Sequence, residues 1–138
     1  MSWQNPQNEK LQYILEHAKT VAVVGLSNNP ERTSYQIAKA MQHAGYRIIP
    51  VNPMIDEVLG EKSYASLTNI DEKIDIINVF RRSEFVLDVA KEAITTDCNV
   101  FWMQQGVINV EAYHLLQRHN FTVVMDSCIK VVHAVLVK

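Results

Sequence analysis

The stretch Thr20-Val-Ala-Val-Val-Gly25-Leu-Ser-Asn-Asn-Pro30 decides the fold, because a short apolar run passes into a polar loop that opens a helix. The continuous apolar run over residues 21–26 is typical of a strand covered on both faces of a sheet. A second strand over residues 47–51 ends in a similar way on Val51-Asn52-Pro53. Strands that alternate with amphipathic helices in this manner predict βαβ units and a parallel sheet.

The same alternation continues to the end of the chain. Further strands are predicted at residues 74–80, 99–103 and 121–125. Helices are predicted after Asn5-Pro6 (an N-cap and a first helical proline), at 35–44 before Gly45, and at 129–137 as a helix or extended tail. Ser83 is predicted to cap a helix that runs to about 96 and turns an apolar stripe inward, namely Phe85, Val86, Val89, Ala90 and Ala93. Asn109 is predicted to cap a helix that runs to about 119. Residues 53–66 are expected to be irregular, with Gly60 in a turn. Right-handed crossovers then predict an α/β, Rossmann-like three-layer domain with a mostly parallel five-stranded sheet, in which residues 1–138 form one domain and residues 1–19 pack on it.

Composition and charge narrow the class of protein. Of the 138 residues, 48% are hydrophobic and 20% are charged, an ordinary balance for a domain that buries a core. A net charge of −2 gives no broad basic surface, so nucleic acid is not an expected partner. No run approaches the ~18 apolar residues of a membrane span, and the N-terminus lacks signal-peptide features. We therefore expect a cytoplasmic protein with reduced cysteines and no membrane partner.

The loop after the first strand has the features of a phosphate cradle. Gly25 allows the backbone to approach a ligand closely, and the helix after the loop presents its N-terminus to an anion. Hydroxyl groups of Ser27 and Ser34 can donate to a phosphate, and Arg32 can pair with one. The loop is not G-x-G-x-x-G, because it holds one glycine. An ordinary strand-to-helix turn with a Ser or Thr cap is the alternative.

The second strand ends without the acidic residue that an NAD site places there to bind ribose. Val51-Asn52-Pro53 offers an amide in its place, and the proline removes a backbone donor. The alternative is an Asn-Pro turn with no ligand. The missing carboxylate predicts a nucleotide-type ligand other than NAD.

Three further strand ends carry polar or glycine residues. Phe80-Arg81-Arg82 suits a polyanion such as a diphosphate, with a solvated arginine pair as the alternative. The segment Trp102-Met103-Gln104-Gln105-Gly106 offers Gln104 and Gly106 to the same crevice, while Trp102 is either a crevice or a core residue.

The fifth strand end contains a cysteine. Asp126 is expected to be the N-cap of the last helix or tail. Cys128, beside Lys130 near a helix start, is a candidate reactive thiol, with an inert packed thiol as the alternative. Cys98 is expected to be a packing residue. The sequence shows no Ser/His/Asp set, paired carboxylates or metal-ligand spacing, so no catalytic or metal-binding residue is predicted.

Taken in order, these segments resemble the family of stand-alone CoA-binding proteins. The domain of that family is similar to the CoA-binding domains of the succinyl-CoA synthetase α subunit and of NDP-forming acyl-CoA synthetases. The resemblance runs from Thr20 to the C-terminus and departs from the family pattern at three positions: Thr33, where proline is common, Ser127, where a basic residue is common, and Val132, where glutamate is common.

The resemblance implies that CoA binds at the crevice. It assigns the phosphates to Gly25, Leu26, Ser27 and the segment from Arg32 to Ser34, and it places Val51, Asn52 and Pro53 beside the adenosine. Phe80, Arg81 and Arg82 would lie beside the pantetheine or phosphates, Trp102 and Gly106 would flank the path to the thiol, and Cys128 would lie near the thiol itself.

The function implied is a non-catalytic module that binds CoA or an acyl-CoA for sensing or as an accessory. One alternative is a subunit of an NDP-forming acyl-CoA synthetase, inactive alone and completed by an ATP-dependent partner protein. Another is a thiol exchange protein that uses Cys128 on CoA disulfides. The apolar helix faces also leave a homodimer open.

Overall fold

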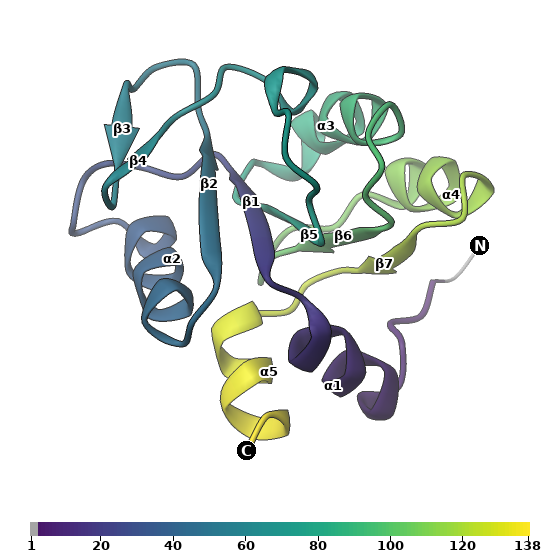
Figure 1. Cartoon of the computed structure of the whole chain (residues 1–138). Coiled ribbons are helices and arrows are strands. Elements are labelled where there is room, and N and C mark those ends of the chain that lie inside the picture. The colour runs from purple at the N-terminus through teal and green to yellow at the C-terminus, as the bar shows by residue number, and fades with distance from the viewer. Residues whose placement is uncertain (1–2) are drawn as a thin grey trace.

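The computed structural model describes residues 3–138, and its centre is a five-stranded parallel sheet (Figure 1). The strands of this sheet lie in the order β2-β1-β5-β6-β7. Their bounds are Thr20–Val24 for β1, Arg47–Val51 for β2, Ile76–Val79 for β5, Val100–Met103 for β6 and Thr122–Val124 for β7. The chain therefore adds β2 on one side of β1 and then crosses to the other side to add β5, β6 and β7.

Helices cover both faces of the sheet and give three layers (Figure 1). The helices are α1 (Asn8–His17), α2 (Thr33–His43), α3 (Val86–Ala93), α4 (Val110–Arg118) and α5 (Ile129–Leu136), with 3₁₀ turns η1 (Leu67–Asn69) and η2 (Ser83–Phe85). Buried residues of α3 and α4 belong to one core cluster, and those of α1, α2 and α5 to the other. The predicted α/β, Rossmann-like class and parallel sheet are confirmed.

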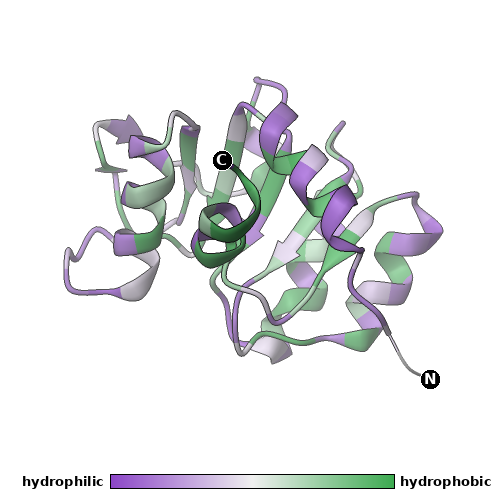
Figure 2. Cartoon of the chain, turned by 90° about the horizontal axis from the view of Figure 1, so that it is seen from below, coloured by the Kyte–Doolittle hydropathy of each residue, from purple (hydrophilic) through white to green (hydrophobic). Residues whose placement is uncertain are grey.

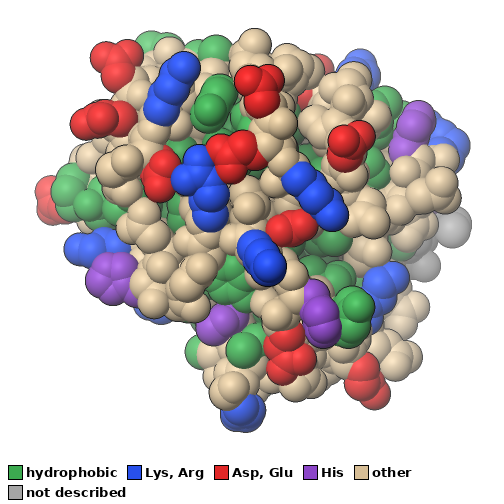
Figure 3. All heavy atoms as spheres, viewed as in Figure 1, with side chains coloured by type: hydrophobic (Ala, Val, Ile, Leu, Met, Phe, Trp, Pro, Cys, Tyr) green, Lys and Arg blue, Asp and Glu red, His purple; other side chains and the backbone are tan. Residues whose placement is uncertain are grey.

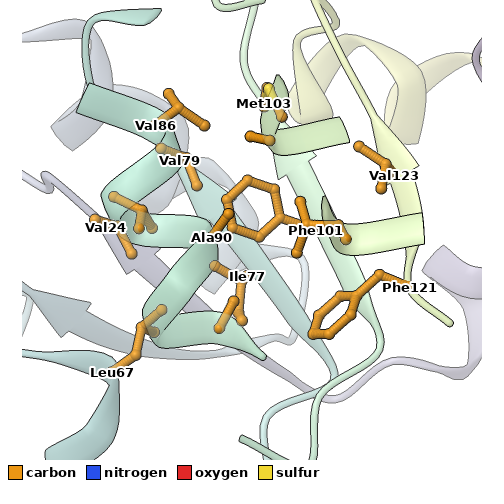
Figure 4. Packing of buried hydrophobic residues seen from close by; sticks show 14 of the residues in the cluster. Val24, Leu67, Ile77, Val79, Val86, Ala90, Phe101, Met103, Phe121 and Val123 are labelled. Carbon is orange, nitrogen blue, oxygen red and sulfur yellow. The ribbon is translucent and has the colours of Figure 1, made fainter. Parts of the chain in front are cut away.

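The two core clusters exist because the central strands are apolar on both faces. In β1, Ala22 and Val24 pack toward α3, whereas Val21 and Val23 pack toward α2, as the alternation of a strand requires. Figure 4 shows side chains from α3, among them Ala90, closing over the strand residues of the first cluster. Each fully buried aliphatic side chain of this kind contributes about 1.5–3 kcal/mol, so these layers supply most of the stabilisation.

Three of the turn and cap residues predicted from the sequence are confirmed. Gly45 follows α2 with a φ of 110°, the left-handed conformation expected of a residue just after a helix. Asn109 caps α4, since its side-chain oxygen accepts a hydrogen bond from the N–H of Ala112 at 2.9 Å. Gly60 lies in a turn with a φ of 76°.

The segment expected to be irregular contains a small antiparallel hairpin. Strands β3 (Glu57–Val58) and β4 (Glu61–Lys62) flank the turn at Gly60. Arg47 of β2 ties the hairpin to the main sheet through an ion pair with Glu61 at 3.2 Å, and its second ion pair, with Glu72, lowers the pKa of that carboxyl. Strands of two residues show no periodicity in a sequence, which is why the hairpin was not predicted.

Ser83 does not cap the helix after it, contrary to the prediction. The chain first forms η2, and the hydroxyl of Ser83 accepts a hydrogen bond from the N–H of Ile108 at 3.0 Å. Phe85, expected to face inward, is 41% exposed and lies beneath the guanidinium of Arg81 at 4.9 Å. The extra 3₁₀ turn rotates this phenylalanine out of the core.

Asn5 likewise does not cap α1, which begins at Asn8 after Gln7. Its side-chain nitrogen donates to the carbonyl of Met125 at 2.8 Å, and its side-chain oxygen accepts from the N–H of Met125 at 2.7 Å. A single asparagine therefore pairs with the backbone just after β7 as a neighbouring strand would. Together with Leu11 and Leu15, which are buried in the second core cluster, it fastens the N-terminal segment to the sheet.

On the face of Figure 3, acidic and basic side chains are interspersed and form no patch of one sign. Figure 2 shows that α5 is unusually apolar for a helix at the surface. Among residues 3–138, no helix has both the length and the hydropathy needed to cross a membrane.

Replacing Asn5 by alanine should lower the free energy of unfolding by about 1–3 kcal/mol, because it leaves the N–H of Met125 without its partner and removes one of the two donors to the Met125 carbonyl. Urea denaturation of Asn5→Ala measures the loss. Gln4→Ala, at an exposed neighbouring position, is the matched control and should leave the midpoint unchanged. Equal midpoints for the two variants would show that Asn5 does not fasten the segment.

Candidate ligand crevice

Three adjoining hollows lie at the carboxyl ends of the strands, near the junction of β1 and β5. The chain adds β2 on one side of this junction and β6 and β7 on the other. The first hollow, of about 520 Å³, is lined by residues that include Gly25, Asn52 and Arg81. The second, of about 450 Å³, lies over the start of α2, and the third, of about 380 Å³, reaches Cys128. Phe80 lines all three, so the hollows form one crevice at the switch point of the sheet.

Gly25 sets the floor of the first two hollows. Its φ is 85°, and its N–H donates to the carbonyl of Val51 at 2.9 Å. A Cβ atom on this residue would lie 2.3 Å from the carbonyl oxygen of Phe80. The loops after β1 and β5 therefore approach each other at a distance that only glycine permits.

The second hollow combines an ordered polar loop with an open helix N-terminus. The hydroxyl of Ser34 accepts from the N–H of Ser27 at 3.0 Å, and the hydroxyl of Ser27 accepts from the N–H of Asn29 at 3.0 Å. Arg32 is the N-cap of α2 and makes no side-chain cap bond. The first-turn N–H groups of α2 are thus left without a side-chain acceptor from the cap, an arrangement that favours an anion.

Asn52 holds two loops of the crevice together. Its side-chain nitrogen donates to the carbonyl of Leu26 at 3.0 Å, while its side-chain oxygen accepts from the N–H of Met54 at 2.9 Å. The amide predicted to border a ligand thus has a structural task as well. Glu92 of α3 lies opposite in the same hollow, and its carboxylate accepts from Ser66 and from the N–H of Leu67.

The third hollow is the least polar of the three. Apolar side chains of Ile37, Phe80 and Val107 line it together with Gln104, Gln105 and Cys128. Cys128 is half-buried at the N-cap of α5, so its thiol is accessible from the hollow. Cys98, by contrast, is 5% exposed, and burial raises the pKa of its thiol to about 11, which confirms it as a packing residue.

The structure brings most of the predicted site residues together. Those that line the crevice are Gly25, Ser27, Arg32, Ser34, Val51, Asn52, Pro53, Phe80, Arg81, Gln104 and Cys128. They come from the loops after four strands and from the starts of α2 and α5.

Four predicted residues do not line the hollows. Trp102 is fully buried in the second core cluster, and its indole nitrogen donates to the carbonyl of Ser127 at 2.8 Å, so it supports the crevice from below. Leu26 is also fully buried and offers only its backbone. Arg82 and Gly106 are exposed outside the hollows.

Asp126 is not the N-cap of α5, contrary to the prediction. It has a φ of 56°, and its carboxylate accepts from the N–H of Gly106 at 2.7 Å, which ties the loop after β6 to the loop after β7. The N-cap position is taken by Cys128 two residues later.

Several lining residues were not predicted, namely Val24, Glu31, Ile37, Met54, Ala65, Val89, Glu92, Gln105 and Val107. Thr33 also lines the crevice and lies inside the segment from Arg32 to Ser34 that was assigned to the phosphates. Val107 comes directly after Gly106, a predicted site residue, and was within reach of the same reasoning. Glu92 gave no signal, because it projects from the middle of a helix whose apolar stripe was assigned to the core. Among residues 3–138, no three His, Cys, Asp or Glu side chains gather as a metal site.

Gly25→Ala should destabilise the fold far more than Gly106→Ala, although both glycines have a φ of 85°. The added methyl at Gly106 meets nothing within 4 Å, so only the backbone conformation costs about 1 kcal/mol. At Gly25 the clash with Phe80 is added, for a total of about 3 kcal/mol or more. Urea unfolding measures both, and equal losses would contradict the close approach.

Two relatives of different size share sequence with this chain. A Bacillus subtilis protein, described as uncharacterized protein YneT, is 58% identical over 132 residues, which are 96% of this chain and 98% of that protein. An ADP-forming acetate–CoA ligase of Methanocaldococcus jannaschii is 34% identical over 67 residues, or 49% of this chain. The match spans 9% of that ligase.

A solved structure and a protein family also resemble this chain over most of its length. A hypothetical protein from Pyrococcus horikoshii OT3 superposes with a TM-score of 0.93 at 30% identity, with 100% of both chains covered. Residues 19–134 match the family described as the CoA binding domain, and they include all five strands of the parallel sheet and the whole crevice. The chain therefore belongs to the CoA-binding domain family.

Proposed function

We propose that this chain binds CoA or an acyl-CoA in the crevice, as a non-catalytic binding, sensing or accessory module. The observation that carries the proposal is the continuity of the three hollows across the switch point, in a chain of the CoA-binding domain family. An extended ligand with an adenosine, a diphosphate and a thiol arm requires a continuous crevice whose lining changes from polar to apolar along its length.

The polarity of each hollow supports an assignment of the ligand's parts. The diphosphate belongs in the second hollow, between Ser27 and the open N-terminus of α2. The adenosine belongs in the first hollow, beside Asn52, with Arg81 in reach of phosphate oxygens. The pantetheine arm belongs in the third, where Ile37 and Val107 offer apolar contact.

An NAD-type ligand is disfavoured at the same crevice. No carboxylate lies directly at the end of β2, where Asn52 stands, to hold two ribose hydroxyls, and both ends of the Asn52 amide are already bonded to backbone groups. Selectivity for CoA over NAD would therefore come from the phosphates and the thiol arm.

A second candidate is a subunit of an NDP-forming acyl-CoA synthetase. The match to an ADP-forming acetate–CoA ligase favours it, and the small share of the ligase that is matched means that an ATP-dependent partner would have to supply the rest. Purification of the chain from its own cells under mild conditions tests this candidate. A partner that confers ATP-dependent CoA ligation would support it, and a chain that binds CoA but elutes alone would contradict it.

A third candidate is thiol exchange on CoA disulfides, favoured by the accessible position of Cys128 in the third hollow. In this reaction the Cys128 thiolate attacks one sulfur of a CoA-containing disulfide. A bond forms between Cys128 and that sulfur as the disulfide bond breaks, and the other half leaves as a thiolate.

Arg81→Ala should weaken CoA binding about tenfold, because it removes a charged donor from the first hollow. Arg82→Ala is the matched control, since it removes the same charge from the next residue outside the hollows and should change the affinity by less than about threefold. Calorimetric titration at fixed ionic strength measures both. Equal losses would indicate a diffuse charge effect and would overturn the placement of phosphate near Arg81.

The proposed function itself is tested with the unmodified chain. Native mass spectrometry should show co-purified CoA, or calorimetry should show CoA binding far more tightly than ADP or NAD. Equal weak binding of all three would reduce the crevice to a general site for adenosine diphosphates.

Treatment with CoA disulfide should add one CoA to the chain, as measured by intact mass. Cys128→Ser should abolish the adduct, whereas Cys98→Ser should retain it, because the Cys98 thiol is buried and its pKa is raised to about 11. An adduct that survives in Cys128→Ser would rule out exchange at this residue.

A further inference from the structure

Helix α5 begins at a residue that cannot cap it well. Its N-cap is Cys128, whose side chain makes no cap bond, whereas Ser, Thr, Asp and Asn are the residues that usually do. The acceptor comes instead from the loop after β6, where the side-chain oxygen of Gln104 accepts from the N–H of Ile129 at 3.3 Å. Gln104 is only 3% exposed, so this cap is supplied from inside the protein.

A second buried amide fixes the direction of this contact. The side-chain nitrogen of Gln104 donates to the side-chain oxygen of Asn78, in the middle of β5, at 3.1 Å. Since the N–H of Ile129 can only donate, Gln104 must present its oxygen to α5 and its nitrogen to Asn78. Asn78 is 1% exposed, so the relay runs from the interior of the sheet to the first turn of α5.

The chain before α5 is held by other bonds. The N–H of Asp126 donates to Val107 at 3.2 Å, the N–H of Ser127 donates to Met103 at 3.3 Å, and the indole of Trp102 bonds Ser127. These contacts end at Ser127. Gln104 therefore supplies the side-chain hydrogen bond to the next part of the chain, the first turn of α5, which is also held by the burial of Ile129 in the second core cluster.

We infer that Gln104 is a positioning residue that seats α5, and with it Cys128, as one wall of the third hollow. Gln104 and Cys128 both line this hollow, yet both ends of the Gln104 amide are engaged within the protein. Its effect on a ligand would thus pass through the position of α5. The inference rests on the proposed function in one respect, because it assigns the third hollow to the thiol arm.

Gln104→Leu and Gln117→Leu form a matched pair. Both replace a glutamine by leucine, but Gln117 is exposed on α4, lies outside the three hollows and takes no part in the relay. Two ligands are titrated calorimetrically: CoA, and adenosine 3′,5′-bisphosphate, which has no thiol arm. Gln104→Leu should weaken CoA about tenfold and the fragment by less than about twofold, whereas Gln117→Leu should change both by less than about twofold.

A second readout does not depend on CoA. Iodoacetamide alkylates an accessible thiol, so loosening the first turn of α5 should speed alkylation of Cys128 several-fold in Gln104→Leu and leave it unchanged in Gln117→Leu. Thermal denaturation verifies that each variant is folded. If the leucine variant does not fold, Gln104→Met, which keeps the length of the side chain, repeats both measurements.

Three results would overturn the inference: equal CoA affinity in the two leucine variants, equal weakening of CoA and the fragment in Gln104→Leu, or an unchanged alkylation rate at Cys128. Failure of the proposed function gives a different pattern, in which the unmodified chain does not bind CoA. Faster alkylation in Gln104→Leu would still support the seating of α5 in that case.

Discussion

The close approach of the loops after β1 and β5 is the constraint on which the crevice depends. At Gly25 the two backbones lie so near that a single added carbon would overlap the carbonyl of Phe80. The chain adds strands on opposite sides of this pair in the parallel sheet, so a ligand here can lie across the edge of the sheet and meet loops from both halves. The floor of the site is therefore main chain, and side chains contribute mainly at its walls.

Around that floor, much of the polar chemistry holds loops to one another. Asn52 links the loops after β1 and β2, Asp126 links those after β6 and β7, and Gln104 links β5 to α5. Such bonds fix the shape of the crevice before a ligand arrives. A preformed site avoids the entropy of ordering its loops at the moment of binding, and more of the interaction energy then appears as affinity.

Features that arise from neighbouring residues could be predicted from the sequence. The apolar runs predicted a parallel sheet, Gly25 and Gly45 predicted turns, and Asn109 predicted a cap, because each depends on a few residues in a row. Asn5 and Asp126 were assigned as caps and are not, because their partners lie 120 and 20 residues away and outcompete the local helix.

The site shows the same division. The loop residues after β1 and β2 were predicted from their position at strand ends. Trp102 and Gln104 lie two residues apart on one face of the chain, and no sequence pattern shows which of them reaches the crevice. Trp102 is closed over by the segment at Ser127, and Gln104 borders the third hollow. Glu92 enters from α3 and could be found only once the helix was placed.

The fastening of the N-terminal segment has a consequence for how the protein folds. Asn5 and its partner Met125 are separated by 120 positions along the chain. Bringing two such distant residues together closes a long loop, and contacts of this kind form slowly because much of the chain must be ordered first. The segment around Asn5 is therefore among the last parts of the chain to reach its native partners.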